Sequence, residues 1–268
     1  MKKQKWSKEK ITKFNVFLNL IKEVKNWHIP LFYYTNVQNG KKIIEFKNDI
    51  KFIIRDKSDS VAFFENFFLK VNFPTKKIEV NDDDVIIDVG AHIGCFTIDV
   101  AKKARKGKII ALEPTKKSYE LLKENIKINN FQNITADNLG IWKKTDKISL
   151  YTSENDSIGN NLFKKTNQIE EINVISLSEC IEKYDIEKID FLKMDCEGAE
   201  FEIILGLTDE TLKKIKKMSI EVHMMRKEFA VEDLMKFLQQ HNFTVNTKST
   251  FEDEKLSMLY AENKELST

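Results

Sequence analysis

The feature that most constrains the fold is the stretch from Asp84 to Gly94, which reads Asp-Val-Ile-Ile-Asp-Val-Gly-Ala-His-Ile-Gly. The β-branched run from Val85 to Val89 is typical of a strand buried on both faces of a parallel sheet. Gly90 and Gly94 bracket a tight turn, and a helical pattern of apolar residues follows. Glycines let backbone N–H groups approach a ligand, and a helix N-terminus favours a negative group. The stretch therefore predicts a strand–turn–helix cradle for a nucleotide-like ligand.

The spacing of glycines and acids indicates which ligand this is. The dinucleotide fingerprint needs G-x-G-x-x-G, whereas this turn has G-x-x-x-G with Asp88 two residues ahead. The next predicted strand, Lys108 to Leu112, ends in Glu113, 19 residues after Gly94. An acid at that place would accept hydrogen bonds from ribose hydroxyls. The pattern resembles the S-adenosylmethionine site of class I methyltransferases more than an NAD site.

Length and charge restrict the class of protein. A chain of 268 residues allows one large core with a small appendage, and its 8 Gly and 3 Pro argue against long linkers. Residues 1–28 hold eight Lys against two Glu. We interpret this segment as a solvated helix face, with contact to nucleic acid, a membrane surface or an acidic partner as the alternative. Because no apolar run reaches a transmembrane length and no signal peptide is recognised, we expect a cytoplasmic protein.

The three cysteines agree with a reducing compartment. They have no metal-ligand spacing and cannot all pair with one another. Small buried thiols next to glycines also need no catalytic role. The cysteines are Cys95, Cys180 and Cys196.

Residues 1–80 are expected to form an N-terminal helical and hairpin cap. Apolar residues spaced three and four apart predict an amphipathic helix over residues 7–28, which Pro30 is expected to end. The dipeptide Asn39-Gly40 fits a type I′ turn. It is predicted to join two strands, over residues 33–38 and 41–46.

The second half of the cap is expected to begin with another turn, at Asn48-Asp49, that leads into a strand over residues 51–55. Ser58 is expected to cap the helix that follows, with Asp59 in its first turn. This helix carries an apolar stripe, which we interpret as core rather than as a platform for a substrate. The stripe consists of Val61, Phe64, Phe67, Phe68 and Val71.

Residues 81–268 are expected to form the cofactor-binding domain. From Asp82 the pattern changes to repeating strand–helix units, which are typical of a parallel sheet. Two further strands, over residues 243–247 and 256–261, are predicted to form a terminal hairpin. Five units and a hairpin match a seven-stranded methyltransferase sheet in count and order. The predicted fold class is α/β, a Rossmann-like, mostly parallel sheet with a terminal antiparallel hairpin.

Three further strands are predicted over residues 134–137, 189–194 and 218–222. Polar residues at their carboxyl ends would meet at the same sheet edge as Asp88. Asn138 suits an adenine edge, although a capping or turn role is an equal alternative. Asp195 ends the strand next to the cofactor, so we favour a function for it. Glu221 and His223 are two residues apart on one strand and therefore point the same way. His223 is either a general base or a structural histidine.

Several motifs together resemble the FkbM family of methyltransferases. The match runs from about Arg55 to His223, and its most discriminating part is the Lys-x-Asp-x-Glu-Gly-x-Glu block. His92 stands where the family usually has Asn. The motifs are Asp88-Val-Gly-Ala-His-Ile-Gly94, Glu113-Pro114, Leu122-Lys-Glu-Asn125 with Asn129, Ile175-Ser-Leu177, Lys193-Met-Asp-Cys-Glu-Gly-Ala-Glu200 and Glu221-Val-His223.

This resemblance implies O-methylation of a sugar, glycan or natural-product hydroxyl with S-adenosylmethionine. Asp195 or His223 would take the hydroxyl proton, and Glu221 would orient His223. No metal is expected. The expected cofactor-binding residues are Asp88, Gly90, His92, Gly94, Glu113, Asn138 and Asp195.

Three alternatives stay open. An RNA or DNA methyltransferase would suit the Lys-rich arm, but the acidic Asp195-Cys-Glu-Gly198 block would repel phosphates. A catalytically silent cofactor-binding protein is the second alternative. In the third, a divalent ion is held by Asp195, Glu221 and His223.

The polar segment over residues 153–170 is expected to be a binding loop. A long loop in a chain poor in Gly and Pro is more often a lid than an idle connection, with a disordered excursion as the alternative. We hypothesise that it closes over the acceptor. Its candidate hydrogen-bonding residues are Ser157, Asn160 and Asn161.

Overall fold

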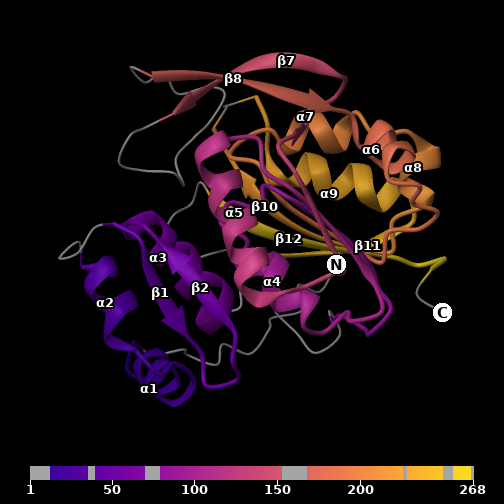
Figure 1. The fold of residues 1–268 in the computed structure, drawn as a ribbon. Coiled ribbons are helices and arrows are strands. Elements are labelled where there is room, and N and C mark those ends of the chain that lie inside the picture. Colours follow the sequence, from indigo (N-terminus) through magenta and orange to yellow (C-terminus); the bar gives the residue numbers. More distant parts are fainter. Residues whose placement is uncertain are drawn as a thin grey trace.

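The computed structural model describes residues 13–35, 40–69, 79–152, 168–225, 228–249 and 256–266. Its centre is a seven-stranded sheet in the order β11-β12-β10-β9-β3-β4-β5 (Figure 1). Five strands are parallel, and β12 runs antiparallel to both of its neighbours. This confirms the predicted mostly parallel sheet with a terminal hairpin. The strands are β3 (Val85–Val89), β4 (Lys108–Leu112), β5 (Ile134–Asp137), β9 (Phe191–Asp195), β10 (Lys217–His223), β11 (Phe243–Ser249) and β12 (Leu256–Asn263).

Helices cover both faces of the sheet because successive residues of a strand point to opposite sides. Ile86 and Ile109 pack against α4, whereas their neighbours Ile87 and Ile110 lie in the large core on the other face. Both faces are therefore apolar, as the β-branched run over β3 predicts. The helices of the domain are α4 (Cys95–Ala101), α5 (Lys116–Asn129), α6 (Leu177–Lys183), α7 (Glu200–Leu205), α8 (Asp209–Lys213) and α9 (Val231–Gln240).

The first 69 residues, as far as they are described, form a cap beside α4 and α5 (Figure 1). Their phenylalanine-rich core continues into the main domain through Ile93, Ile98 and Leu121. Phe64 and Phe68 are buried in it and Phe67 packs against it, which confirms the core interpretation for these three residues of the stripe, whereas Val71 lies outside the described residues. The cap consists of α1 (Lys13–Glu23), α2 (His28–Tyr34), β1 (Lys42–Glu45), β2 (Lys51–Ile54), α3 (Lys57–Phe64) and the π-helical turn η1 (Glu65–Leu69).

Three predictions for the cap are wrong. Pro30 lies inside α2, in the first turn, where a missing N–H leaves no hydrogen bond broken. Tyr33 also belongs to α2, so the strand predicted from residue 33 does not begin there. The buried ring of Tyr33 packs in the cap core, and its hydroxyl donates to the Gly40 carbonyl. Asp56, not Ser58, caps α3, because its carboxylate is the group that accepts from the Asp59 N–H.

The hairpin of the cap joins β1 to β2 through the turn predicted at Asn48-Asp49. Asp49 adopts φ +68°, which Asp tolerates better than most residues. Residues 36–39, including Asn39 of the other predicted turn, lie outside the described part of the chain.

A second, three-stranded sheet has the order β6-β8-β7 and lies at the top of the view in Figure 1. Its strands are β6 (Gly140–Ile141), β7 (Asp146–Thr152) and β8 (Gln168–Ile175). The predicted binding loop lies outside the described residues except for 168–170, which belong to β8. Among the described residues, no helix has the length and apolar character needed to cross a bilayer.

Candidate active site

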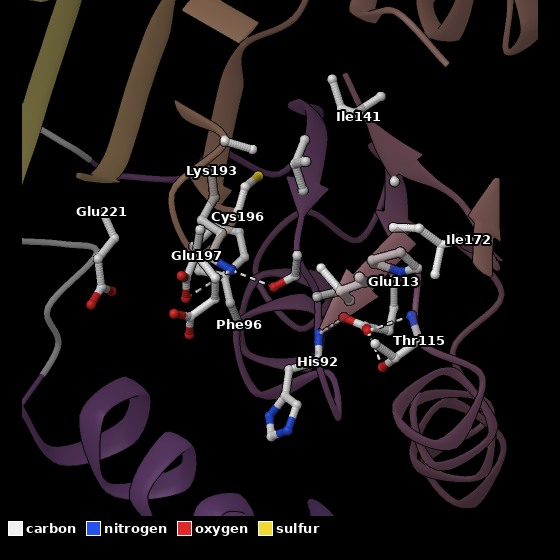
Figure 2. A pocket seen from close by; sticks show the side chains of 18 of the residues that line it. His92, Phe96, Glu113, Thr115, Ile141, Ile172, Lys193, Cys196, Glu197 and Glu221 are labelled. Atoms are coloured by element: carbon white, nitrogen blue, oxygen red, sulfur yellow. Dashed lines mark hydrogen bonds and ion pairs between the residues drawn. The ribbon is translucent and has the colours of Figure 1, made fainter. Parts of the chain in front are cut away.

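A pocket opens at the carboxyl ends of β3, β4, β9 and β10, where the sheet meets the cap and the three-stranded sheet. Its two ends differ in chemistry (Figure 2). Glu113 lies at one end, which we call the Glu113 end. Glu197 and Glu221 lie at the other end. Asp195 and Glu65 are near enough to interact with the charge of Glu221, and we call these four residues the acid end.

Three donors fix the carboxylate at the Glu113 end. Its Oε2 accepts from the His92 N–H at 2.8 Å, and its Oε1 accepts from the N–H and hydroxyl of Thr115 at 2.9 and 2.5 Å. Glu113 is only 6% exposed and lines the pocket. Beside it stands an apolar wall from the three-stranded sheet and the turn after β6, formed by Ile141, Trp142, Ile148, Leu150, Ile172 and Val174.

A buried ion pair between Asp88 and Lys193 supports the glycine turn. Asp88 is fully buried, accepts from the Thr97 hydroxyl at 2.5 Å and lies 3.2 Å from Lys193 Nζ. Lys193 in turn donates to the Gly90 carbonyl at 2.7 Å. Burial lowers the pKa of Lys193, but the charges of Asp88 and Asp195 outweigh it and raise the pKa above its ordinary value. Asp88 therefore supports the turn from behind the pocket wall.

The two glycines of the turn have different surroundings. Gly90 adopts φ +75°, and a Cβ there would lie 1.8 Å from the Asp195 carbonyl oxygen. Only glycine therefore allows β3 and β9 to approach so closely. Gly94, at φ +90°, precedes α4 and packs on Leu122, outside the residues that line the pocket.

His92 and Asn138 have side-chain partners in the fold. His92 offers its backbone N–H to Glu113, while its imidazole extends away toward the cap (Figure 2). The Asn138 amide donates to the carbonyls of Glu113 and Pro114, and Asn138 is not among the pocket-lining residues. These contacts favour the turn role for Asn138. Binding of the cofactor by either side chain stays a prediction.

Carboxyl groups crowd together at the acid end. Asp195 and Glu221 are register partners on the parallel strands β9 and β10, so they leave the sheet edge side by side. Burial and the charge of Asp195 raise the pKa of Glu221 to about 8. The same two causes raise the pKa of Glu65 to about 7. Near neutral pH Glu65 is therefore about half-protonated, and Glu221 is mostly protonated.

His223 lies behind the acid end. Its Nδ1 is 3.1 Å from Glu200 Oε1, and its Nε2 is 3.5 Å from Glu197 Oε2. Burial lowers the pKa of His223, but the hydrogen bond to Glu200 and the charges of the neighbouring acids raise it to about 10. His223 is therefore an imidazolium at neutral pH. The acids that contact its ring are Glu200 and Glu197. Orientation of His223 by Glu221 stays a prediction.

Asp195, Glu197 and His223 also bring ligand-type atoms within 4.8 Å of one another. This group has Glu197 in place of the Glu221 expected from the sequence. Its charges are already paired in part, because the His223 ring contacts two carboxylates.

Glu65 is the residue of the acid end that the sequence did not reveal. It lies in a phenylalanine-rich segment, where the apolar stripe predicted only core. The signal was present in two polar residues, Glu65 and Asn66, within that stripe. Both line the pocket, and they are presented by η1, a π-helical turn of the kind that is frequent at functional sites.

Comparison with known proteins gives consistent matches. The family model of the methyltransferase FkbM domain matches residues 88–245. Methyltransferase 1 of Beauveria bassiana is 24% identical over 208 residues, which cover 66% of this chain and 82% of that protein. The 31-O-demethyl-FK506 methyltransferase FkbM of Streptomyces tacrolimicus is 24% identical over 198 residues, which cover 63% and 75% of the two chains.

A solved structure shares the fold. The methyltransferase FkbM from Methylobacillus flagellatus KT matches with a TM-score of 0.53 at 14% identity, over 92% of this chain and 58% of that one. The predicted fold class of a class I methyltransferase is therefore confirmed.

Proposed function

The chain belongs to the FkbM family of methyltransferases, and from this premise we propose that it methylates a hydroxyl group of a sugar, a glycan or a small natural product. Its cofactor is S-adenosylmethionine. One observation carries the proposal: a single pocket joins a fixed carboxylate beside an apolar wall to a group of proton-accepting carboxyl groups. The Streptomyces relative, named as an O-demethyl-FK506 methyltransferase, supports O-methylation.

The Glu113 end fits the nucleoside half of the cofactor. Oε1 of Glu113 accepts from two groups of Thr115, and Oε2 accepts from one N–H. A carboxylate oxygen has two acceptor sites, so Oε2 retains one for a ribose hydroxyl. The apolar wall beside it suits the faces of an adenine ring. When bound, S-adenosylmethionine supplies an activated methyl group on a positively charged sulfur.

The acid end is where we place the acceptor hydroxyl. Asp195 is the proposed proton acceptor because it lines the pocket and its backbone carbonyl lies against Gly90 of the glycine turn. His223 is charged and cannot accept a proton. Glu221 beside Asp195 is mostly protonated near neutral pH, so Asp195 would accept the proton of the hydroxyl first. A general base contributes roughly 10²–10⁴-fold, and holding the two reacting groups in line supplies a further ~7–11 kcal/mol.

The charge of the acid end argues against a phosphate-bearing acceptor. Glu65, Asp195, Glu197 and Glu221 all line the pocket, and Lys193 is already paired with Asp88. A neutral hydroxyl can approach this group, whereas a phosphodiester would be repelled by the Asp195 carboxylate. An RNA methyltransferase is the alternative, and a mobility-shift assay with generic RNA at low salt would detect it.

The test is to incubate the protein with methyl-labelled S-adenosylmethionine and a panel of sugars, glycans and natural products, and to analyse the products by mass spectrometry. We expect a product heavier by one methylene unit in which the methyl is on oxygen. Asp195→Asn is the control that should remove it. If the protein binds the cofactor but methylates no member of the panel, the silent cofactor-binding alternative replaces the proposal.

A further inference from the structure

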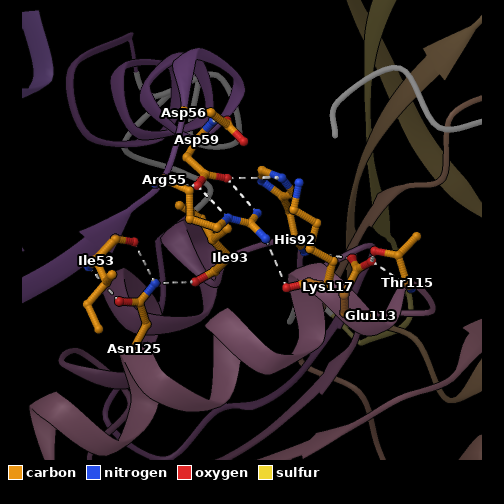
Figure 3. A network of polar contacts seen from close by, with 10 residues as sticks. All are labelled: Ile53, Arg55, Asp56, Asp59, His92, Ile93, Glu113, Thr115, Lys117 and Asn125. Carbon is orange, nitrogen blue, oxygen red and sulfur yellow. Dashed lines mark hydrogen bonds and ion pairs between the residues drawn. The ribbon is translucent and has the colours of Figure 1, made fainter. Parts of the chain in front are cut away.

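The turn that carries His92 contacts the cap as well as the pocket. His92 adopts φ +50°, a conformation that few non-glycine residues take. In this conformation its N–H points to Glu113 and its imidazole reaches the cap, where Nε2 lies 3.6 Å from Asp59 Oδ1 (Figure 3). The side chain of His92 is 19% exposed and that of Asp59 is fully buried. A single residue therefore connects the Glu113 carboxylate to a buried charge of the cap.

The carboxylate of Asp59 is itself held rigidly. Arg55 donates to it from Nε and Nη2, each at 2.9 Å, and from its backbone N–H at 2.7 Å. Such a two-pronged guanidinium–carboxylate contact fixes orientation as well as distance. Asp56 caps the same helix turn and accepts from the Asp59 N–H. Asp59 is thus in a fixed place before any ligand arrives.

Arg55 reaches the other side of Glu113 as well. Its Nη1 donates to the Lys117 carbonyl at 2.9 Å, at the start of α5 and two residues after Thr115. Thr115 supplies the two hydrogen bonds to Glu113 Oε1. The Arg55–Asp59 pair therefore holds both segments that fix the Glu113 carboxylate, one through His92 and the other through the first turn of α5 (Figure 3).

We propose that Asp59, locked by Arg55, is a positioning residue for the cofactor: through His92 it fixes the turn that aims the Glu113 carboxylate into the pocket. The cap then belongs to the cofactor site, although none of the cap residues in this contact chain reaches the pocket. This inference rests on the cofactor end of the proposed function and adds to it a residue from a separate part of the sequence.

Another polar contact between the cap and this turn offers a contrast. The Asn125 amide donates to the carbonyls of Ile93 and Ile53 and accepts from the Ile53 N–H (Figure 3). This contact fastens β2 to the turn without touching Glu113. If cap docking alone mattered, Asn125 would be sufficient, so the contribution of Asp59 has to be measured as cofactor affinity and not as stability.

The experiment measures the affinity of the full chain for S-adenosylhomocysteine by titration calorimetry, together with Tm, for wild type, Asp59→Asn, His92→Asn and the double variant. Asparagine keeps the shape of Asp59 without its charge. At position 92 it tolerates the left-handed backbone but is too short to reach Asp59. Asp99→Asn is the matched control, because it removes a surface ion pair with Lys103 on α4.

We expect each single variant to weaken binding by about 5- to 50-fold, in the range of couplings between residues in contact. The double variant should be no weaker than the weaker single variant, because both act through one contact. Asp99→Asn should bind like wild type. If Asp59→Asn fails to fold, His92→Asn at unchanged Tm carries the test alone.

Wild-type affinity in a folded Asp59→Asn or His92→Asn, or full additivity in the double variant, would overturn the positioning role. A wild-type protein that does not bind S-adenosylhomocysteine would instead contradict the cofactor site itself, so the two failures are distinguishable.

Discussion

The two ends of the pocket are stabilised in opposite ways. At the Glu113 end the carboxylate has its partners, because three donors hold Glu113. Behind the pocket wall, Thr97 and Lys193 hold Asp88. At the acid end, burial and mutual repulsion raise the pKa of Glu65, Glu197 and Glu221. The first end is preformed for a ligand, whereas the second holds carboxyl groups in a state that proton uptake relieves. We propose that this contrast separates cofactor binding from proton transfer along one cavity.

The largest loss of stability and binding should come from disturbing the close approach of Gly90 to Asp195, which lies between the two ends. In Gly90→Ala the added Cβ would meet the Asp195 carbonyl oxygen at 1.8 Å. Relief requires movement of β3 against β9, so we expect a loss of at least about 3 kcal/mol of stability and no measurable cofactor binding. Gly40→Ala is the control, because Gly40 also has a positive φ, +88°, but nothing lies within 4 Å. Equal losses in both variants would show that backbone strain alone, not the close approach, matters.

A substitution at the acid end should separate chemistry from binding. Asp195→Asn keeps the size of the side chain but removes the proton acceptor, so methyl transfer to the acceptor found in the panel should fall by roughly 10²–10⁴-fold. Affinity for S-adenosylhomocysteine should stay within about twofold. Single-turnover assays and calorimetry measure the two effects. Transfer at the wild-type rate would place the base elsewhere.

A substitution at the Glu113 end should weaken cofactor binding first. Glu113→Ala removes a charged acceptor of ribose hydroxyls, which is worth about 1.5–3 kcal/mol. Calorimetry with S-adenosylhomocysteine measures the loss, and circular dichroism should show an intact fold. Unchanged affinity would reduce Glu113 to a residue that only fastens the His92 and Thr115 turns.

A smaller effect should appear in the pH dependence of stability. Because the pKa of Glu221 is raised from 4.5 to about 8, its contribution to folding is complete below the unfolded-state pKa and is lost as pH rises through about 8. Glu221→Gln cannot ionise. At about pH 9 its Tm should therefore exceed that of wild type by ~2–4 °C for each kcal/mol that the ionised Glu221 costs the folded protein. This gain should disappear at about pH 4.

The control for this measurement is Glu210→Gln, whose side chain is 86% exposed. It should show no such pH-dependent gain. A constant Tm difference across the pH range in Glu221→Gln would contradict the crowding of carboxyl groups at the acid end.

The smallest effect should follow metal removal. His223 already places a positive charge between Glu197 and Glu200. Dialysis against EDTA should therefore leave methyl transfer within about twofold. Loss of transfer that Mn²⁺ or Mg²⁺ restores would establish the metal-assisted alternative at Asp195, Glu197 and His223.

The sequence was sufficient for the Glu113 end because its residues follow fixed spacings. Gly90 and Glu113 each come directly after a strand, and parallel strands deliver such residues to one edge. Asp195 was predictable for the same reason. The function of these residues as a binding and catalytic set stays a prediction.

The acid end was less predictable because its residues come from elements that only packing brings together. Glu65 reaches Asp195 from the cap, and Glu200 reaches His223 from the first turn of α7. In the cap, the strong local turn signal of Asn39-Gly40 predicted a strand over residues that include Tyr33. Burial of Tyr33 in α2 outweighed it, as tertiary packing commonly does.

The most direct test of the two-ended pocket is an experimental structure of the protein with bound S-adenosylhomocysteine. We expect the ribose within hydrogen-bond distance of Glu113, the adenine against the wall of the three-stranded sheet, and the sulfur facing Asp195. A nucleoside bound at the acid end, with its ribose on Glu221 and its sulfur near Glu113, would contradict it.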